Sequence, residues 1–348
     1  MGLNIREIIP RKEINLEKLK GQIVAVDALN TLYQFLSSVR QVDGTPLMDN
    51  KKRITSHLSG IFYRNISLIL DGIKLVYVFD GKPPELKYKT HEKRGESREI
   101  AKEKYETAKS REDLESMKTY ASQLVRLNSE MIEESKELLK AMGIAVIQSP
   151  GEGEAEAAYI VRTSKDKKVF GVVSQDYDSL LFGAPRLIQN LTLARKRKTI
   201  SGYVEVKPEV IELREVLDNL DIGLEQLICL GILVGTDYNP KGIPGIGQKK
   251  ALQIVKQYKQ PVLIFKAMEE KINALDEKDK FNWSEIFALF KKPDVVDSDI
   301  VFPKLNEEKI KKILVDEHDF SEQRVENQLE KLRDAKERQK QKGLDKWF

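Results

Sequence analysis

The chain has 348 residues, 41% of them hydrophobic and 33% charged, which is typical of a folded, charge-rich protein and excludes an intrinsically disordered one. Its net charge of +4 is too small to indicate a nucleic-acid partner by itself, so any basic surface has to be local. One cysteine and three histidines exclude a disulfide framework and a Cys/His zinc site. We expect neither a signal peptide nor a membrane-spanning helix.

Four short apolar runs predict β-strands, because each is bounded by polar or turn-forming residues. They are residues 23–26, 75–79, 144–147 and 169–173. Helical patterns lie between them, for example at 56–70 and 129–142. Strands that alternate with helices predict an α/β fold with a mostly parallel central sheet flanked by helices. In such a sheet, ligands bind beyond the carboxyl ends of the strands.

The segment from about residue 84 to about residue 130 contains strong helix formers but almost no apolar face. Such helices either project through solvent or are not stably folded alone, and a solvated helical hairpin is the simpler interpretation. Residues 187–206 then predict a β-hairpin, and apolar helices follow it. From about residue 319 onward the sequence predicts a charged helix.

Acidic residues follow all four predicted strands at their carboxyl ends. The set comprises Asp27, Asp80, Glu152, Glu154, Asp176 and Asp178. Like charges gathered at one edge of a sheet repel strongly unless cations lie between them. Ligand sets made only of oxygen select hard cations such as Mg²⁺ or Mn²⁺. So many carboxylates indicate two ions, a pair suited to cleaving a phosphodiester by in-line displacement.

Each acid taken singly has a simpler explanation. An aspartate after a strand is usually a turn residue or a helix cap, and Glu152 and Glu154 also favour a helix N-terminus. The agreement of four strand ends favours the metal hypothesis. We expect Glu156, in the same run, to be solvated, and Asp71 to lie in an ordinary turn at the end of a helix.

The segment GIPGIGQKKALQIV, which begins at Gly242, predicts a tight glycine turn that opens a helix. Gly245 and Gly247 would let backbone N–H groups approach a phosphate, and Lys249 and Lys250 in the first helical turn would add positive charge. The pattern is typical of a helix–hairpin–helix element that holds duplex DNA by its backbone. A plain interhelical turn is the alternative.

The motifs together resemble a known family. In chain order they are IVAVDALNTLYQFL, VYVFDGKPPELK, SPGEGEAEAAY, VVSQDYDSLLFG and GTDYNPKGIPGIGQKKA. This series, which runs through the whole chain, resembles the flap endonucleases of archaea and eukaryotes, within the structure-specific 5′ nuclease superfamily. The resemblance implies a metal-dependent enzyme that removes 5′ flaps in lagging-strand maturation and long-patch base-excision repair, with accompanying 5′-exonuclease activity.

The resemblance also implies roles for individual residues. It implies two Mg²⁺ ions, replaceable by Mn²⁺, with seven carboxylate ligands: Asp27, Asp80, Glu152, Glu154, Asp176, Asp178 and Asp237. Lys87 and Arg94 are implied to reach the scissile phosphate from the base of a helical arch formed by the polar helices. The expected DNA contacts are Gly2, Tyr33, Arg40, Thr55, Gly245, Gly247, Lys249 and Lys250. Among these, Tyr33 would stack near the cleaved base.

The last residues resemble a clamp-binding box, with Gln341, Leu344, Trp347 and Phe348 as its anchors. This resemblance implies the sliding clamp (PCNA) as a partner. Eukaryotic members usually continue in a basic tail, whereas this sequence stops at Phe348, which favours an archaeal enzyme of the cytoplasm. A nuclear location would apply only to a eukaryotic source. We expect a monomer apart from the clamp.

The predicted organisation is one nuclease core at 1–330 and a clamp-binding tail at 331–348. Within the core we expect an N-terminal region at about 1–98, an arch and cap at about 84–130, an internal nuclease region at about 116–258, and the helix–hairpin–helix element at about 234–258.

Three other functions fit part of the sequence. A phosphatase or RNase on a carboxylate-edged sheet would not need the glycine turn or the clamp box. A non-catalytic, clamp-bound module that binds DNA junctions would not need a complete acid set. A related metal-dependent 5′ exonuclease would share most features, but the long arch favours an endonuclease that selects junctions by their structure.

Overall fold

The computed structural model describes residues 3–41, 43–87, 99–101, 103–107, 120, 124, 126–164, 168–193, 196–199 and 202–344. Most of the predicted arch and cap therefore lies outside the described residues. So do four predicted site residues, Gly2, Arg94, Trp347 and Phe348.

A seven-stranded sheet forms the centre of the described part, in the order β1-β9-β6-β5-β2-β3-β4. Its strands are β1 (Lys12–Glu13), β2 (Ile23–Asp27), β3 (Lys74–Phe79), β4 (Ala145–Gln148), β5 (Val169–Val173), β6 (Arg186–Gln189) and β9 (Glu209–Glu212). Strands β6, β5, β2, β3 and β4 pair in parallel, whereas β9 pairs antiparallel with β6 and β1. The predicted α/β fold with a mostly parallel sheet is confirmed. A hairpin of β7 (Lys196–Thr199) and β8 (Gly202–Glu205) lies within the segment 187–206 predicted to form one, but the first residues of that segment belong to β6 of the central sheet.

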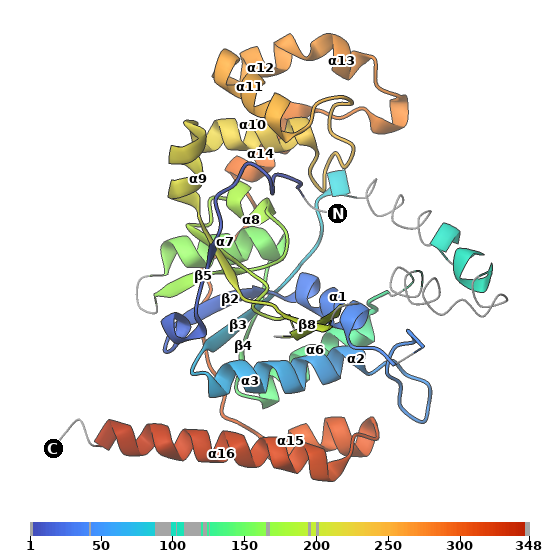
Figure 1. Ribbon diagram of the computed structural model, residues 1–348, viewed down its shortest axis with the longest axis vertical. Coiled ribbons are helices and arrows are strands. Elements are labelled where there is room, and N and C mark those ends of the chain that lie inside the picture. Colours follow the sequence, from blue (N-terminus) through green and yellow to red (C-terminus); the bar gives the residue numbers. More distant parts are fainter. Residues whose placement is uncertain are drawn as a thin grey trace.

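Alternation along the buried strands divides the apolar side chains between two cores, because successive residues of a strand point to opposite faces. In β2, Ile23 and Ala25 belong to one core, while Val24 and Val26 belong to the other. The helices that contribute to the first core are α7 (Gly153–Thr163), α8 (Asp178–Leu181), α9 (Leu213–Leu220), α10 (Leu224–Val234), α11 (Gln248–Tyr258), α12 (Pro261–Ala267) and α14 (Trp283–Lys291). A short helix, α13 (Glu269–Asn273), follows α12 at the same end of the molecule (Figure 1).

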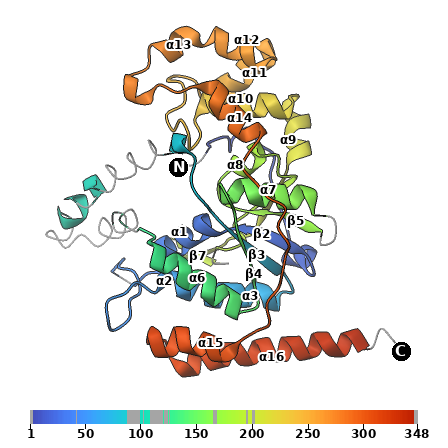
Figure 2. The same ribbon diagram turned by 180° about the vertical axis from the view of Figure 1, so that it is seen from behind.

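Helices cover the second face in two layers. The inner layer holds α1 (Ala28–Ser38), α2 (Ser56–Ser59), α3 (Asn65–Leu70) and α6 (Ser129–Ala141). Figures 1 and 2 show an outer layer formed by α15 (Glu307–Lys311) and α16 (Glu322–Leu344), which lies against α3 and α6. The π-helix η5 (Lys312–Glu317) joins the two outer helices.

The predicted helix at 56–70 is continuous but contains a π-helical turn, η2 (Gly60–Arg64), between α2 and α3. A Cβ atom on Gly60 would stand 2.2 Å from Cγ of Phe35, so glycine allows α1 to pack directly against this turn. Asp71 ends α3 and Gly72 follows with a φ of 83°, which confirms the predicted turn.

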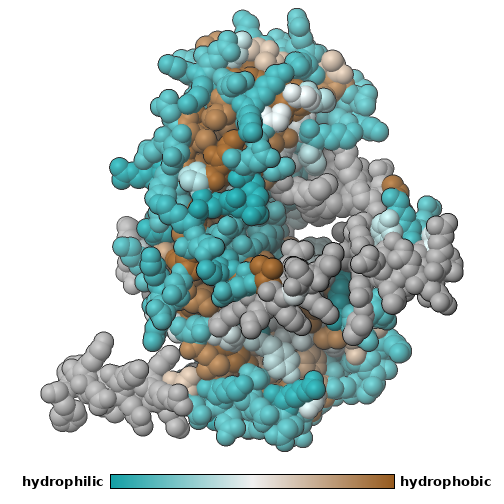
Figure 3. All heavy atoms as spheres, in the orientation of Figure 1, coloured by the Kyte–Doolittle hydropathy of each residue, from teal (hydrophilic) through white to brown (hydrophobic). Residues whose placement is uncertain are grey.

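On the face shown in Figure 3, hydrophilic side chains predominate, and apolar ones show in separate groups in the upper, middle and lower parts of the molecule. Cys229 lies buried within α10, as its apolar surroundings in the sequence suggest. Among the described helices, none combines the length and the hydropathy needed to cross a bilayer.

Candidate active site

The parallel strands bring the predicted acids to one edge of the sheet. Asp27 is the last residue of β2, and Asp80 directly follows β3. Glu152 is the N-cap of α7, and Glu154 lies in its first turn. Asp176 and Asp178 follow β5, with Asp178 as the first residue of α8. The predicted convergence at the carboxyl ends of the strands is therefore observed.

Asp27 acts both as a helix cap and as a member of the cluster. Its Oδ1 accepts a hydrogen bond from the backbone N of Asn30 at 3.1 Å and so caps α1. Its Oδ2 lies 3.2 Å from Oγ of Ser174, and the same hydroxyl lies 3.1 Å from Oε1 of Glu154. One hydroxyl thus connects carboxylates from two different elements.

The position of the Asp80 carboxylate requires a glycine at residue 153. The backbone N of Gly153, at the start of α7, donates to Oδ1 of Asp80 at 2.7 Å. A Cβ atom on residue 153 would stand 2.5 Å from that oxygen, closer than real side chains pack. Glycine therefore lets a carboxylate sit against a helix N-terminus, where the helix dipole favours negative charge.

Asp176 is held by a side-chain amide, whereas Asp178 has a free oxygen. Nδ2 of Asn30 donates to Oδ2 of Asp176 at 2.8 Å, and Oδ1 of Asn30 accepts from the backbone N of Gln175 at 3.2 Å. Oδ1 of Asp178 is buried and has no hydrogen-bond partner among the described residues. A buried carboxylate oxygen without a donor is costly unless a cation binds it.

Burial and mutual repulsion disfavour the charged forms of these acids. Burial, followed by repulsion from Asp80, raises the pKa of Asp27 to about 7. Burial also raises the pKa of Glu154 well above its usual range, with Asp27 adding repulsion. The pKa of Asp178 rises in the same way through burial and repulsion from Asp237. A divalent cation would remove this penalty.

Lys87 supplies a positive charge from within the chain. It ends the 3₁₀ turn η3 (Glu85–Lys87), and its Nζ contacts Oε1 of Glu152 and lies 3.5 Å from Oδ2 of Asp237. Burial alone would lower the pKa of Lys87, but the carboxylates of Glu152, Asp237 and Asp80 outweigh it, so the pKa is raised and the ammonium stays charged. The predicted catalytic lysine therefore lies inside the acidic cluster.

No three acidic, histidine or cysteine side chains of the described residues already surround one point closely enough to hold a metal ion. Repulsion among the carboxylates and the ion pairs of Lys87 both favour such a spread arrangement. The donor set nevertheless fits a hard cation, because every candidate ligand is an oxygen. The unpartnered oxygen of Asp178 and the raised pKa values of Asp27, Glu154 and Asp178 also favour a bound cation at this edge.

Sequence reasoning missed the contacts that Ser174, Asn30 and Tyr238 make with the acids. The hydroxyl of Tyr238 donates to Oε2 of Glu152, and the Tyr238 ring packs edge-on against Phe290 at 5.4 Å between centroids. Its position directly after Asp237, in GTDY, was the available signal.

The expectation that Glu156 is solvated was wrong. Its side chain is buried and accepts from the backbone N of Val296 at 3.0 Å and from a serine hydroxyl at 3.1 Å.

The predicted glycine turn joins α10 to α11 and has the expected conformation. Gly242 and Gly245 have φ values of 56° and 76°, and a Cβ atom on Gly242 would stand 2.3 Å from the backbone O of Val234. Gly247 is the N-cap of α11. A Cβ atom on Gly245 or Gly247 would meet no atom within 4 Å, so this backbone is open to an approaching ligand. Lys249 is 79% exposed. The DNA contact itself stays a prediction.

Three other predicted DNA contacts lie in the described part of the chain. Tyr33 is 38% exposed, whereas Thr55 is only 4% exposed. The guanidinium of Arg40 donates to the carbonyl oxygens of Ser37 and Gly44, at 3.1 and 2.6 Å. Of the predicted clamp anchors, Gln341 and Leu344 lie in the last turns of α16. These assignments stay predictions.

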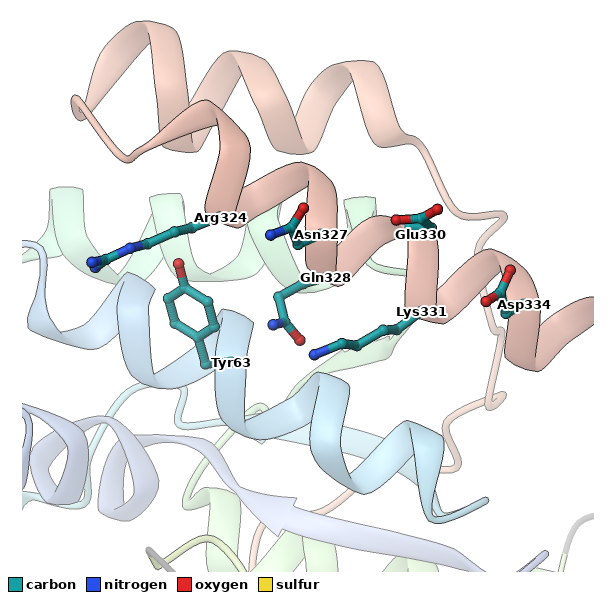
Figure 4. A pocket seen from close by; sticks show the side chains of 7 residues that line it. All are labelled: Tyr63, Arg324, Asn327, Gln328, Glu330, Lys331 and Asp334. Carbon is teal, nitrogen blue, oxygen red and sulfur yellow. The ribbon is translucent and has the colours of Figure 1, made fainter.

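A groove of about 510 Å³ lies between η2 and α16 (Figure 4). It is lined by Tyr63, Arg324, Asn327, Gln328, Glu330, Lys331 and Asp334. None of these residues belongs to the acidic cluster, and the lining mixes both signs of charge. We therefore place the chemistry at the sheet edge and not in this groove.

Two family models match the chain: the XPG N-terminal domain at residues 4–101 and the XPG I-region at residues 143–237. These regions hold all seven predicted carboxylate ligands, and the fold and the acidic edge together define a nuclease of the XPG class.

Comparison with individual relatives narrows the class of nuclease to which the chain belongs. The chain is 53% identical to flap endonuclease 1 of Pyrococcus furiosus and to that of Thermococcus onnurineus, in each case over 100% of this chain and 99% of the relative. The solved structure of flap endonuclease-1 from Methanococcus jannaschii is 40% identical, with a TM-score of 0.73, and the match covers 96% of this chain and 98% of that one. The catalytic core of Rad2 in complex with DNA substrate shares the fold at 23% identity and a TM-score of 0.68, over 94% of this chain and 99% of that one. The chain belongs to the flap endonuclease family, which confirms the resemblance seen in the sequence.

Proposed function

We propose that this chain is a structure-specific 5′ flap endonuclease with accompanying 5′–3′ exonuclease activity, which hydrolyses DNA phosphodiesters near the junction of single strand and duplex. The observation that carries this proposal is the convergence of the acidic residues with Lys87 at one edge of the sheet. High identity to proteins named flap endonuclease 1 over the whole chain supports it.

The cofactor we infer is a pair of Mg²⁺ ions, which Mn²⁺ can replace. Their ligands would come from Asp27, Asp80, Glu152, Glu154, Asp176, Asp178 and Asp237. When bound, the ions supply Lewis-acid polarisation of the scissile phosphate and stabilise the charge that develops on its oxygens.

The chain's own residues prepare this edge for a phosphodiester. Lys87 keeps its proton next to Glu152 and Asp237, so it can offset negative charge on the scissile phosphate. Tyr238 fixes Glu152 through its hydroxyl. Asn30 donates to Asp176 and so orients this one proposed ligand before substrate arrives.

Recognition of structure would come from contacts away from the cleavage point. Gly245, Gly247, Lys249 and Lys250 would hold the duplex backbone without reading its sequence. The remaining proposed DNA contacts are Gly2, Tyr33, Arg40, Thr55 and, at the arch, Arg94. Such a site suits flap removal in lagging-strand maturation and long-patch base-excision repair.

We further propose the organisation expected from the sequence, with a nuclease core at 1–330 and a tail at 331–348. In the tail, Gln341, Leu344, Trp347 and Phe348 would bind a sliding clamp; the first two of these residues lie at the end of α16. The enzyme would otherwise act as a monomer in the cytoplasm.

The test compares three labelled DNAs: a 5′-flap junction, a blunt duplex and a single strand. Each is incubated with the full chain, with Mg²⁺ or with EDTA. We expect Mg²⁺-dependent cutting near the junction of the flap substrate. Equal cutting of all three DNAs would indicate a general nuclease, and binding without cutting in Mg²⁺ or Mn²⁺ would indicate a non-catalytic junction-binding module.

A further inference from the structure

Two of the chain's three histidines lie buried together. His57 is fully buried and His318 is 2% exposed. Carboxylates from two other segments face them: Asp49, from the hairpin that precedes α2, and Glu134, from α6. We call His318, Asp49, Glu134, His57 and Arg53 the His318 cluster.

The geometry at His318 sets its charge. Nδ1 of His318 lies 3.2 Å from Oδ2 of Asp49, and Nε2 lies 3.1 Å from Oε1 of Glu134. An ionised carboxylate can only accept hydrogen bonds, whereas a neutral imidazole has one donor nitrogen. Both contacts can therefore be hydrogen bonds only when His318 is an imidazolium. A neutral ring would point a lone pair at one of the two carboxylates.

The remaining members of the cluster balance its charge. Nε of Arg53 donates to Oδ2 of Asp49 at 2.7 Å, and His57 lies with Nε2 at 3.8 Å from Oε2 of Glu134. Burial lowers the pKa of His57, which keeps that ring neutral. Burial would also lower the pKa of His318, but hydrogen bonding to Glu134 outweighs it and raises the pKa. The two positive charges of Arg53 and His318 then balance the two negative charges of Asp49 and Glu134.

The cluster fastens the tip of a hairpin to the outer helical layer. Asp49 also accepts from the backbone N of Lys51 at 2.9 Å and of Arg53 at 2.8 Å, which closes the hairpin tip. The backbone N of Asn50 donates to Oδ2 of Asp319 at 3.0 Å. Arg53 also donates to the carbonyl of Glu317, the last residue of η5. Three contacts therefore join the hairpin tip to residues 317–319, at the end of η5 and just after it.

The hairpin connects two residues that we propose to contact DNA. Arg40 pairs with Pro46 in an isolated β-bridge at its base, and the backbone N of Thr55 donates to the carbonyl of Leu47 at 2.8 Å. A further bridge joins Met48 to residue 54. A displacement of the tip would therefore be transmitted along the hairpin to both of these positions.

We propose that His318, as an imidazolium, is a positioning residue for substrate binding: it locks the hairpin at residues 46–54 against the outer helical layer and so holds Arg40 and Thr55 in place. This proposal rests on the proposed function through those two residues. Its consequence is a pH dependence of substrate binding that is separate from the acidic site. The contacts of His318 with Asp49 and Glu134 are kept below the folded-state pKa of His318 and are weakened as pH rises through that pKa.

The first test does not depend on nuclease activity. ¹⁵N-labelled histidine in the full chain reports the protonation of each ring nitrogen by NMR. We expect both ring nitrogens of His318 to be protonated at pH 7 while His57 is neutral. We also expect the protection factors of the Lys51 and Arg53 amides against hydrogen exchange to fall as His318 loses its proton. A neutral His318 at pH 7 would overturn the proposal. So would protection factors at the hairpin tip that stay constant while His318 titrates.

The second test measures cleavage by His318→Gln, whose amide nitrogen can still donate hydrogen bonds but whose side chain carries no charge. For the wild type we expect KM for a flap substrate to rise at alkaline pH. For His318→Gln we expect KM to be about tenfold higher, with little change in kcat and without this alkaline rise. The matched control is Lys309→Gln, which breaks an exposed ion pair between α15 in the outer layer and Glu137 on α6 in the inner layer. Equal KM values for His318→Gln and the control would overturn the proposal. Absence of flap cleavage by the wild type would instead refute the proposed function and leave the NMR result standing.

Discussion

Replacing Asp27 by asparagine should stabilise the protein when no divalent cation is present, although it removes a proposed metal ligand. Burial together with repulsion from Asp80 raises the pKa of Asp27 from 3.8 to about 7. Asparagine keeps the cap of α1, because its side-chain oxygen can still accept from the backbone N of Asn30. The substitution therefore removes a buried charge and preserves the local structure.

The size of the effect follows from the shift in pKa. One pKa unit corresponds to about 1.4 kcal/mol, so a shift from 3.8 to about 7 sets an upper bound of about 4 kcal/mol on the stability gained at pH 8. Because neighbouring carboxylates share the repulsion, we expect a measured gain of about 1–3 kcal/mol. The folded-state pKa lies above the unfolded value, so the wild type loses this stability as pH rises through the interval from 3.8 to about 7.

The assay is urea unfolding followed by circular dichroism in EDTA, at pH 5 and at pH 8. The control is Asp218→Asn on α9, where the aspartate side chain is 72% exposed. We expect the free energy of unfolding of Asp27→Asn to exceed that of the wild type by more at pH 8 than at pH 5. We also expect Mg²⁺ to stabilise the wild type more than the variant. A variant less stable than the wild type at pH 8 in EDTA, or a difference that does not change with pH, would refute this reasoning.

Three further predictions concern single contacts and the tail. Gly153→Ala should displace the carboxylate of Asp80, because the added Cβ would stand 2.5 Å from its Oδ1, and calorimetry should show weaker Mn²⁺ binding by about tenfold or more. Tyr238→Phe removes the donor to Glu152 and should destabilise the fold by about 1 kcal/mol in urea unfolding while lowering kcat; an unchanged kcat would mean that this hydrogen bond is only structural. Deleting residues 341–348 should leave flap cleavage unchanged without a clamp but abolish binding to an archaeal clamp by surface plasmon resonance, whereas retained clamp binding would exclude the proposed box.

The sheet and the acidic edge could be predicted from sequence because both depend on local pattern. Apolar runs of strand length predicted β2, β3, β4 and β5 to within a residue or two. Parallel pairing then required the residues that follow them to meet, which is a property of the topology and not of any single side chain. The acids at Asp27 and Asp80 were therefore predictable before any contact was known.

Contacts between residues distant in sequence were not predictable in the same way. Glu156 stands among acids on an exposed-looking turn of α7, and only the fold shows that the chain at Val296 covers it and supplies donors. His318 and Asp49 are 269 positions apart, and neither lies in a recognisable motif. The π-helical turn η2 also leaves no clear sequence signal.

The most direct test of the central claim measures divalent-ion binding at the acidic edge. Mn²⁺ is titrated calorimetrically into the wild type, Asp178→Asn and the control Asp218→Asn, and binding of each protein to 5′-flap DNA is measured in Ca²⁺. The account predicts that Asp178→Asn binds Mn²⁺ at least about tenfold more weakly and loses Mg²⁺-dependent flap cleavage while it still binds the DNA, and that the control matches the wild type. Unchanged Mn²⁺ affinity in Asp178→Asn, with cleavage intact, would contradict the claim that these carboxylates hold the catalytic ions.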